Sequence, residues 1–256
     1  MHTSFNRHRM GPGPSTSTAV AEILVDECER DLPLIALPRP QICLVARFGP
    51  SARKGLDVHA LGVQQTVHRK LIRGGQRTVL ARLHLGTYEA VLGVPAADTA
   101  GRIVALEDLW GDAAAQRLLD RLARAPDAVA ATAVMESAIA ERTARADRPG
   151  ARTQLAFNAA GRLGSANVAT VASDLGVSER HLRRVFREAV GVSPKTFARL
   201  TRFHRALGAA REKGATSWAS IAAAVGYYDQ AHLIAEFRAI AGATPRAFLA
   251  ELHGTG

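Results

Sequence analysis

HLRRVFREAVGVSPKTF, residues 181–197, matches HLIAEFRAIAGATPRAF, residues 232–248, without a gap. Seven of the 17 paired positions are identical, where two unrelated stretches of this length share about one. The match predicts that the chain contains two copies of one structural unit, 51 residues apart.

The residues before each copy identify the unit as a helix-turn-helix. Residues 168–176 and 218–226 each place a small residue, Ala172 or Ala222, four positions before a glycine. Two helices that cross steeply need a small side chain at the crossing, and the turn between them needs a residue that tolerates positive φ. We therefore expect helix-turn-helix units at about 166–190 and 217–241.

The second helix of the first unit has an apolar face and a basic face. Four apolar residues recur with helical spacing and are expected in the core: Leu182, Val185, Phe186 and Ala189. Four arginines follow the same spacing on the opposite face: Arg180, Arg183, Arg184 and Arg187. A basic stripe is often only a solvated face, but on the second helix of such a unit it favours DNA, because arginine can donate two hydrogen bonds to guanine.

The second copy has fewer charges. Its equivalent positions are Ala231, Ile234, Ala235 and Arg238. Gln230, just before them, could pair with adenine or contact the backbone. We expect the first unit to supply most of the base readout and the second to depend on phosphate contacts, thymine methyl groups and DNA shape.

A linker helix is expected at about 195–211, with one face in the core (Leu200, Phe203 and Leu207) and one facing outward (Arg199, Arg202 and Arg205). At 1.5 Å per residue it spans roughly 25 Å, which could place the two recognition helices about one DNA turn apart. The expected contacts to the DNA backbone are the two helix N-caps and five basic residues: Ser178, Asp229, Arg187, Lys195, Arg199, Arg202 and Arg238.

The part before residue 154 differs in texture. Residues 1–18 are expected to be a disordered tail, 19–145 a regulatory or dimerisation domain, 146–153 a hinge and 154–256 the DNA-binding domain. An apolar-periodic piece at 21–28 precedes a block of about six strands, and two helices follow at 113–125 and 128–145. The expected strands are 42–48, 58–63, 66–72, 78–85, 88–94 and 102–106, which fit a small half-barrel.

Composition agrees with a globular protein that binds a polyanion. The 256 residues are 47% hydrophobic and 22% charged, and 33 basic against 23 acidic residues give a net charge of +10. The part up to residue 150 has 19 basic and 16 acidic residues (+3) and the rest has 14 and 7 (+7). Arginine supplies 29 of the 33 basic residues, which can also reflect a coding bias, so the charge alone does not decide for nucleic acid.

No apolar run approaches the roughly 20 residues of a membrane span, and the N-terminus lacks the apolar stretch of a secretory signal. We therefore expect a cytoplasmic protein without a membrane partner. The two cysteines, Cys28 and Cys43, are too few for a disulfide scaffold or a four-cysteine zinc site. They could sense oxidants as a pair, but burial as small hydrophobes is the favoured state.

Other chemistry-bearing residues are expected to be structural. Three histidines could bind a metal but lack a His-x-His pair, so ordinary surface or turn histidines are favoured: His59, His68 and His84. His181 and His232 begin the two copies and are expected to pack helices or contact phosphates. Trp110 and Trp218 could line an effector pocket but are expected in the core. No metal and no cofactor is predicted.

Residues 154–252 resemble the DNA-binding domain of the AraC/XylS family of bacterial transcription regulators. The resemblance is carried by GYYDQAHLIAEFRAIAGATP, residues 226–245, which has the form of the family signature, and by residues 202–206. It implies an all-α domain of seven helices with two helix-turn-helix units. The base-reading positions of the family correspond to Arg180, Arg183 and Arg184 in the first unit and to Gln230, Ala231 and Ala235 in the second. The last two alanines depart from the family in offering no polar group.

The resemblance extends less specifically to the N-terminal part, where residues 80–111 resemble a block found in some of these regulators. The expected fold class is therefore α+β: a half-barrel-like N-terminal domain with two following helices, and the seven-helix domain. Family members usually carry an effector-binding or dimerising domain in this place. The partners implied are double-stranded DNA, RNA polymerase, a small-molecule effector and a second copy of the chain.

Three classes of function compete. A sequence-specific transcription regulator is favoured by the duplication, the arginine face and the charge asymmetry. An enzyme with a borrowed DNA-binding domain, such as the alkylation-repair regulators that resemble Ada, needs a zinc-bound cysteine cluster, and no hydrolase elbow, phosphate loop or zinc-protease motif is present. We therefore expect no enzyme. The third class is a metabolite-binding or dimerisation protein with a weak or vestigial DNA-binding surface. The operator, the effector and the sign of regulation stay open.

Overall fold

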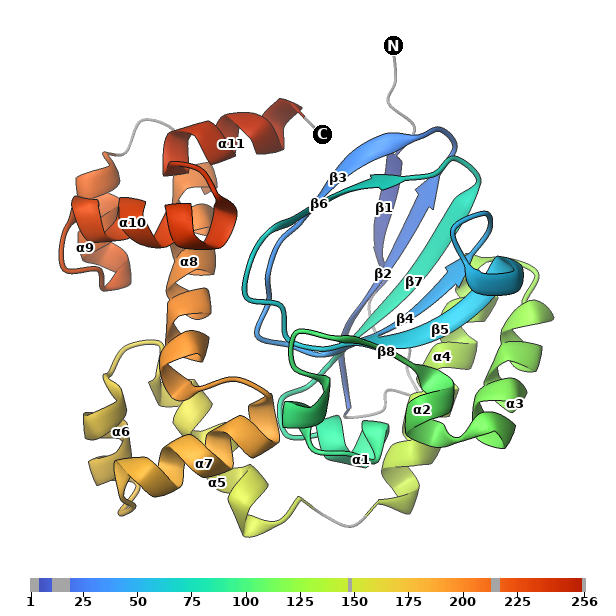
Figure 1. Ribbon diagram of the computed structural model, residues 1–256, viewed down its shortest axis with the longest axis horizontal. Helices are drawn as coiled ribbons and strands as arrows, with labels where there is room; N and C mark the ends of the chain where they lie inside the picture. The colour runs from blue at the N-terminus through green and yellow to red at the C-terminus, as the bar shows by residue number, and fades with distance from the viewer. Residues whose placement is uncertain (1–4, 11–18, 147–148, 213–216, 255–256) are drawn as a thin grey trace.

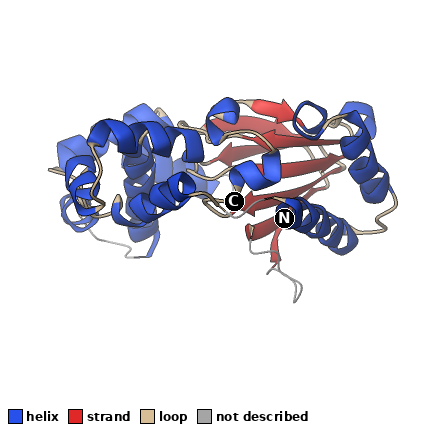
Figure 2. Cartoon of the chain, turned by 90° about the horizontal axis from the view of Figure 1, so that it is seen from below, coloured by secondary structure: helices blue, strands red, loops and turns tan. Residues whose placement is uncertain are grey.

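The computed structural model describes residues 5–10, 19–146, 149–212 and 217–254. A β-rich N-terminal part and a helical C-terminal part lie side by side (Figure 1). Figure 2 shows the sheet and the C-terminal helices at opposite ends of the molecule. The α+β fold class predicted from the sequence is confirmed.

The N-terminal part is built on an antiparallel sheet of six strands in the order β1-β2-β7-β4-β5-β8. A separate pair, β3 with β6, lies across one end of this sheet (Figure 1). The strands are β1 (Phe5–Met10), β2 (Val20–Cys28), β3 (Leu32–Ala36), β4 (Cys43–Phe48), β5 (Leu56–Leu61), β6 (His68–Ile72), β7 (Gln76–Leu83) and β8 (Ile103–Ala105).

The two faces of the main sheet differ in chemistry. Period-2 alternation gives one face small and branched apolar side chains, among them Ile23, Leu44 and Val79, all fully buried. This face shares a core with α3 (Asp112–Ala123) and α4 (Ala128–Arg145), which cover it in Figure 1. The other face carries charged and polar groups between apolar ones.

Two sequence predictions for this part are wrong. Residues 88–94 do not form a strand: α1 (Tyr88–Leu92) is a helix, because Tyr88, Val91 and Leu92 are buried at helical spacing. Residues 5–10 of the predicted tail form edge strand β1, which pairs with β2 through its backbone and needs no apolar pattern to do so. The remainder of the predicted tail lies outside the described residues. Strand β3, which contains a proline, was not predicted, although a strand was predicted at its partner β6.

Short elements complete this part: η1 (Arg53–Gly55), η2 (Ala96–Thr99) and α2 (Leu106–Trp110). Both cysteines are free and buried, as predicted. Burial raises the pKa of the Cys43 thiol to about 12, so this thiol stays protonated at neutral pH. The Cys28 thiol donates to the Arg30 carbonyl at 2.6 Å.

The described ranges 149–212 and 217–254 contain the seven helices that the resemblance implied. They are α5 (Ala151–Arg162), α6 (Val168–Asp174), α7 (Glu179–Val190), α8 (Pro194–Glu212), α9 (Trp218–Val225), α10 (Gln230–Ala241) and α11 (Pro245–Gly254). Helix α5 begins inside the segment predicted as a hinge, 146–153. No helix in the described part of the chain is long and apolar enough to span a membrane.

The two helix-turn-helix units have the predicted crossings and turns. Ala172 and Ala222 are 2% and 1% exposed where α6 meets α7 and α9 meets α10. Gly176 and Gly226 in the turns have φ of +66° and +86°, a conformation that favours glycine. The local sequence therefore determines both units.

Candidate nucleic-acid interface

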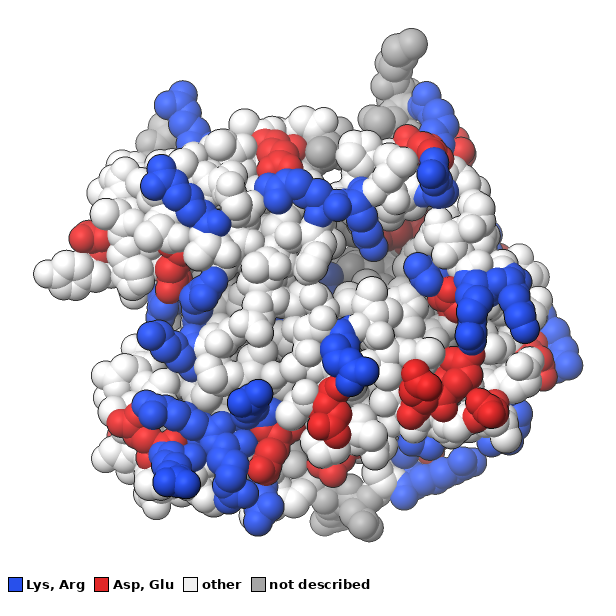
Figure 3. All heavy atoms as spheres, viewed as in Figure 1, with Lys and Arg blue, Asp and Glu red and all other residues white. Residues whose placement is uncertain are grey.

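Helix α7 is held in one rotation about its axis. Its N-terminus is capped by Ser178, whose hydroxyl accepts from the His181 amide at 3.2 Å. Leu182 and Phe186 are fully buried, and the Phe186 ring packs edge-on against Phe197 at 5.4 Å. All four arginines of the basic stripe are therefore exposed: Arg180, Arg183, Arg184 and Arg187. Figure 3 shows Lys and Arg side chains gathered over this end of the molecule.

Two of these arginines pair with acidic residues of their own helix. Arg183 pairs with Glu179, and an Arg184 nitrogen lies 3.5 Å from a Glu188 carboxylate oxygen. Such exposed pairs contribute about 0–1 kcal/mol, so a phosphate or a base edge can replace them. Arg180 and Arg187 make no ion pair with any residue that the structure describes. The helix therefore presents four guanidinium groups that incoming DNA can bind.

Helix α10 presents shorter and fewer charged side chains than α7. Asp229 caps it, with the carboxylate accepting from the His232 amide at 2.7 Å. Gln230, Ala235 and Arg238 are exposed on the side away from the core. Tyr228, in the turn before the cap, is 93% exposed. The sequence analysis assigns no role to Tyr228, because the sequence does not show that this turn residue is exposed.

Arg202 does not face outward as predicted. Its guanidinium donates to a Glu236 carboxylate oxygen at 3.1 Å and lies over the Tyr227 ring at 5.4 Å. The Arg202 and Glu236 side chains are only 23% and 13% exposed. Because a largely buried carboxylate needs a cation, Arg202 joins α8 to α10 within the protein. The outward prediction for this residue is wrong.

The other linker positions are closer to expectation. Leu200, Phe203 and Leu207 are buried as predicted. Lys195 is exposed, and Arg199 is half-buried. Arg205 is exposed and donates to the Gly164 carbonyl at 2.7 Å, so it ties α8 to the loop after α5.

The recognition helices α7 and α10 lie at opposite ends of α8 (Figure 1). Both begin at the outer edge of the molecule and run toward the N-terminal part. Helix α8 has 19 residues, about 28 Å of helix. The N-terminal ends of both recognition helices therefore lie along one edge of the molecule (Figure 1).

Residues 171–251 match the family model described as a helix-turn-helix domain. This part of the chain is an AraC-type helix-turn-helix domain. The chain is accordingly a DNA-binding transcription regulator.

Solved structures similar to the chain include transcription regulators. ToxT from Vibrio cholerae is 10% identical over 96% of this chain and 97% of its own, with a TM-score of 0.44. The AraC-like transcriptional activator CuxR is 14% identical over 83% of both chains, with a TM-score of 0.29. A DNA-binding transcriptional dual regulator from Escherichia coli K-12 is 26% identical over 42% of this chain and 96% of its own, with a TM-score of 0.34. No curated protein matches the chain.

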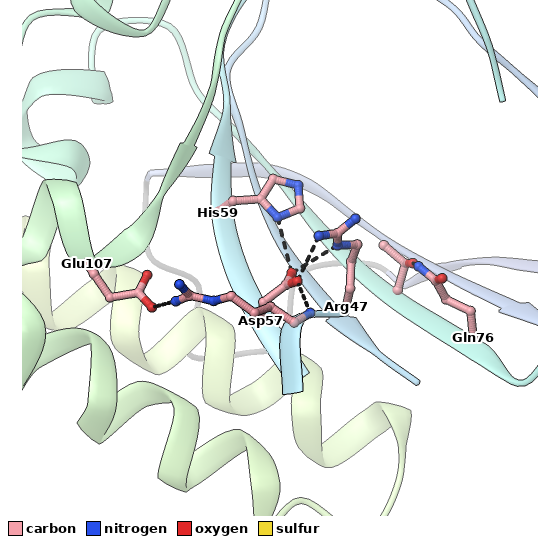
Figure 4. A network of polar contacts seen from close by, with 7 residues as sticks. Arg47, Asp57, His59, Gln76 and Glu107 are labelled. Carbon is pink, nitrogen blue, oxygen red and sulfur yellow. Dashed lines mark hydrogen bonds and ion pairs between the residues drawn. The ribbon is translucent and has the colours of Figure 1, made fainter. Parts of the chain in front are cut away.

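The N-terminal histidines do not all lie where the sequence placed them. His68 and His84 are exposed as predicted, but His59 is buried on the polar face of the sheet. Its Nδ1 lies 3.4 Å from Asp57, which also accepts two hydrogen bonds from Arg47 at 2.9 and 2.7 Å (Figure 4). Burial, reinforced by Arg47, lowers the pKa of His59. Nowhere in the described residues do three His, Cys, Asp or Glu side chains lie close enough to hold a metal.

The carboxylate at the centre of this network is stabilised as an anion. Burial raises the pKa of Asp57, but hydrogen bonds from the Arg47 side chain and the Arg53 backbone outweigh it and lower the pKa overall. Gln76, on the neighbouring strand β7, is buried with its carbonyl oxygen lacking a hydrogen-bond partner among the described residues. These polar groups lie on the sheet face that the helices α3 and α4 do not use.

Both tryptophans pack against the core, as predicted. The Trp110 indole donates to the Val91 carbonyl at 2.9 Å, with Arg142 over its ring at 5.0 Å. Trp218 packs edge-on against Phe237 at 6.0 Å within the AraC-type domain.

A cavity of about 450 Å³ lies at the seam between the two parts of the chain. Its walls come from the loop before β4, the segment after β7 and helices α5 and α8, and they include Pro40, Gln41, Leu85, Phe157, Asn158 and Phe197. Most of this lining is apolar. The sequence had no signal for the cavity, because its walls are far apart along the chain.

His204 links α8 to the N-terminal part in a buried position that disfavours its charged form. Its Nε2 contacts the Pro38 carbonyl, and burial, with Arg39, Arg82 and Arg211 nearby, lowers the pKa of the imidazole to about 4. The ordinary value, near 6.5, applies in the unfolded chain. The unfolded state therefore binds more protons below pH 6.5, and stability falls as the pH drops from there toward 4.

We expect the free energy of unfolding to fall more between pH 7 and pH 5 in the wild type than in His204→Gln, by about 1–2 kcal/mol. Glutamine keeps a donor for the Pro38 carbonyl but does not titrate. Urea unfolding at both pH values measures the difference. Equal pH dependence in the two proteins would show that His204 is solvated in solution.

Proposed function

We propose that the protein is a sequence-specific transcription regulator of the AraC/XylS type that binds promoter DNA through both helix-turn-helix units. The observation that carries the proposal is the arginine face of α7: four exposed guanidinium groups on a capped helix whose rotation is fixed by buried Leu182 and Phe186. Such a helix can enter the major groove with its N-terminal residues against the base edges.

The two helix-turn-helix units contribute differently to DNA recognition. In the first, Arg180, Arg183 and Arg184 read bases, since a guanidinium fork matches the two acceptors of guanine. In the second, Gln230 is the one polar base reader, and the exposed alanines suit thymine methyl groups. The proposed backbone contacts are Ser178, Arg187, Lys195, Arg199, Asp229 and Arg238; Arg202 no longer belongs with them, because its guanidinium is held by Glu236.

The N-terminal part is proposed as the regulatory domain, for an effector or for dimerisation. Two features support a small-molecule effector. The cavity at the seam is lined by both parts of the chain, so a molecule bound there would contact both. The polar sheet face carries a buried Gln76 carbonyl oxygen without a partner among the described residues.

Selection from random duplexes by the full-length protein tests the proposal, with binding of the selected sequences followed across salt concentrations. The proposal expects a motif of two segments about one helical turn apart and an affinity that falls steeply with salt. A single enriched segment would make the second unit a backbone clamp. No enrichment at any salt concentration would contradict sequence-specific binding.

The lack of polar side chains at two exposed positions of α10 favours a second candidate function. Ala231 and Ala235 occupy exposed positions where a base reader is expected, so the DNA-binding surface could be vestigial and the protein a metabolite-binding or dimerisation protein. A salt-dependent affinity for duplex DNA in the same experiment would exclude this candidate.

Ala235→Arg is expected to strengthen binding to DNA several-fold without loss of stability. Ala235 is exposed, while the core stripe of α10, Leu233, Phe237 and Ile240, stays intact. The added cation gains a phosphate or base contact. Titration of a selected duplex measures the gain, with Ala250→Arg on the exposed side of α11 as a control for charge alone. An equal gain in both variants would show that α10 does not enter the groove.

A further inference from the structure

The N-terminal part grips the second helix-turn-helix unit at the end of its recognition helix. The Val67 amide donates to the Ile240 carbonyl at 2.8 Å, and the Arg69 side chain donates to the Ala241 carbonyl at 2.8 Å. Arg69 also makes a two-pronged ion pair with Glu251 of α11, at 2.5 and 2.8 Å. We call these five residues the clasp.

The clasp satisfies groups that a helix cannot satisfy by itself. The last four carbonyls of an α-helix have no partner within the helix, and Ile240 and Ala241 end α10. Both receive donors from β6 and the residue before it. The Arg69 hydrogen bonds lower the pKa of Glu251, so the pair stays charged at neutral pH.

The first unit meets the N-terminal part at the end of its recognition helix too, but there the contact is close backbone packing. Gly191, with φ of +87°, ends α7, and a side chain there would come within 2.9 Å of the Ala96 carbonyl oxygen in η2. The neighbouring Val190 and Val192 are buried. Midway between the units, His204 of α8 contacts the Pro38 carbonyl. The N-terminal part therefore touches the AraC-type domain at both recognition helices and between them.

We propose that the N-terminal part is a splint that sets the relative position of the two recognition helices, and that the clasp is its releasable end. This inference rests on the proposed function. The contacts lie at the C-terminal ends of α7 and α10, while the N-terminal ends point away (Figure 1). The splint therefore leaves the proposed DNA-reading face free and fixes its geometry.

The two ends of the splint differ in strength. At α7 the contact is close backbone packing beside buried valines. At α10 it consists of one backbone hydrogen bond and the contacts of the Arg69 side chain, whose ion pair with Glu251 is partly exposed, with Arg69 44% and Glu251 31% exposed. Exposed ion pairs contribute little to stability and are sensitive to their surroundings. A signal received by the N-terminal part would therefore free the second unit before the first.

Opening the clasp is expected to weaken binding only to DNA that contacts both helix-turn-helix units. A unit held in place pays less ordering entropy on binding, so the closed clasp raises affinity for a two-segment duplex and leaves a one-segment duplex unaffected. By linkage, two-segment DNA in turn favours the closed clasp.

Arg69→Ala in the full-length protein tests the splint, and Arg73→Ala is the matched control. Arg73 lies just after β6 and pairs with Asp31 at 2.6 Å, within the N-terminal part. Both variants lose one positive charge from the same arm and leave one carboxylate without its arginine, Glu251 or Asp31, so the net charge of the protein changes equally. The probes are the selected two-segment duplex and the same duplex with its second segment scrambled.

We expect Arg69→Ala to bind the two-segment duplex about 5–10-fold more weakly than Arg73→Ala and the scrambled duplex within about 2-fold of it. Equal weakening on both duplexes, or no difference between the variants, overturns the splint. Tighter binding by Arg69→Ala also overturns it, since the clasp would then hold the units in a wrong geometry.

Hydrogen exchange of the free protein separates this inference from the proposed function. The splint requires faster exchange at α10, α11 and the Val67 amide in Arg69→Ala than in Arg73→Ala, with α6 and α7 unchanged. Unchanged exchange overturns the clasp whatever the DNA results. Faster exchange in a protein that selects no duplex would refute the proposed function and the splint's role in DNA binding, while the interdomain contact itself stands.

Discussion

Phe203→Ala is expected to lower the free energy of unfolding by about 3–5 kcal/mol, the usual cost of removing a fully buried aromatic ring. Phe203 of α8 is 0% exposed. Its ring lies 4.7 Å from the Phe237 ring of α10 and 6.1 Å from the Phe248 ring of α11. Removing it opens a cavity where the linker helix meets the second unit, so that unit loses most of the support from α8.

Urea unfolding followed by circular dichroism measures this change, and Phe157→Ala is the control. Phe157 is 50% exposed on α5, so its loss is expected to cost less than about 1 kcal/mol. Similar losses in the two variants would show that Phe203 is not the centre of the second unit. Phe203→Leu should lie between them, because leucine fills part of the cavity.

The parts of the fold that depend on local sequence could be predicted. Ala172, Gly176, Ala222 and Gly226 meet local requirements, a small residue at a crossing and positive φ in a turn, that hold wherever the unit lies in the molecule. The period of the apolar residues likewise indicated which face of α7 is buried. Exposure of the arginines follows from that period, although only DNA can test their roles.

The parts that depend on distant partners could not be predicted. Residues 88–94 read as a strand because their aliphatic residues suit either structure, and only packing against α4 decides for a helix. His59 is buried because Asp57 and Arg47 lie beside it on one sheet face. Arg202 turns inward because Glu236, 34 residues further along, is there to pair with it. Helical periodicity contains no information about such partners.

The regulatory geometry was the least accessible from sequence. The clasp joins Arg69 to Glu251, 182 residues apart. Neither residue belongs to a motif, and each alone resembles an ordinary surface charge. The cavity at the seam is similar, since its walls come from loops and helices of both parts. A residue-by-residue interpretation identifies the DNA-binding units but not how the rest of the chain holds them.

Arg184→Ala is expected to cost about 1–3 kcal/mol of DNA-binding free energy, with most of the loss at one base pair of the selected site. Arg184 lies at the centre of the exposed face of α7, and its Nη2 is 3.4 Å from His181 Nδ1. Its contacts with His181 and Glu188 leave the guanidinium group open to solvent, and the Arg184 side chain is 50% exposed. Titration of all single-base variants of the selected duplex measures where the loss falls.

A uniform electrostatic loss must be separated from this effect, because removing Arg184 also leaves Glu188 unpaired near the phosphates. Arg187→Ala, one turn further along with the same change of charge, is the matched control. We expect it to weaken binding equally for every sequence and to reduce the salt dependence by about one phosphate contact. Arg184→Ala could instead weaken binding equally for every sequence, as Arg187→Ala does, and adding Glu188→Gln could restore the lost affinity. In that case Arg184 contacts a phosphate, and only Arg180 and Arg183 read bases in the first unit.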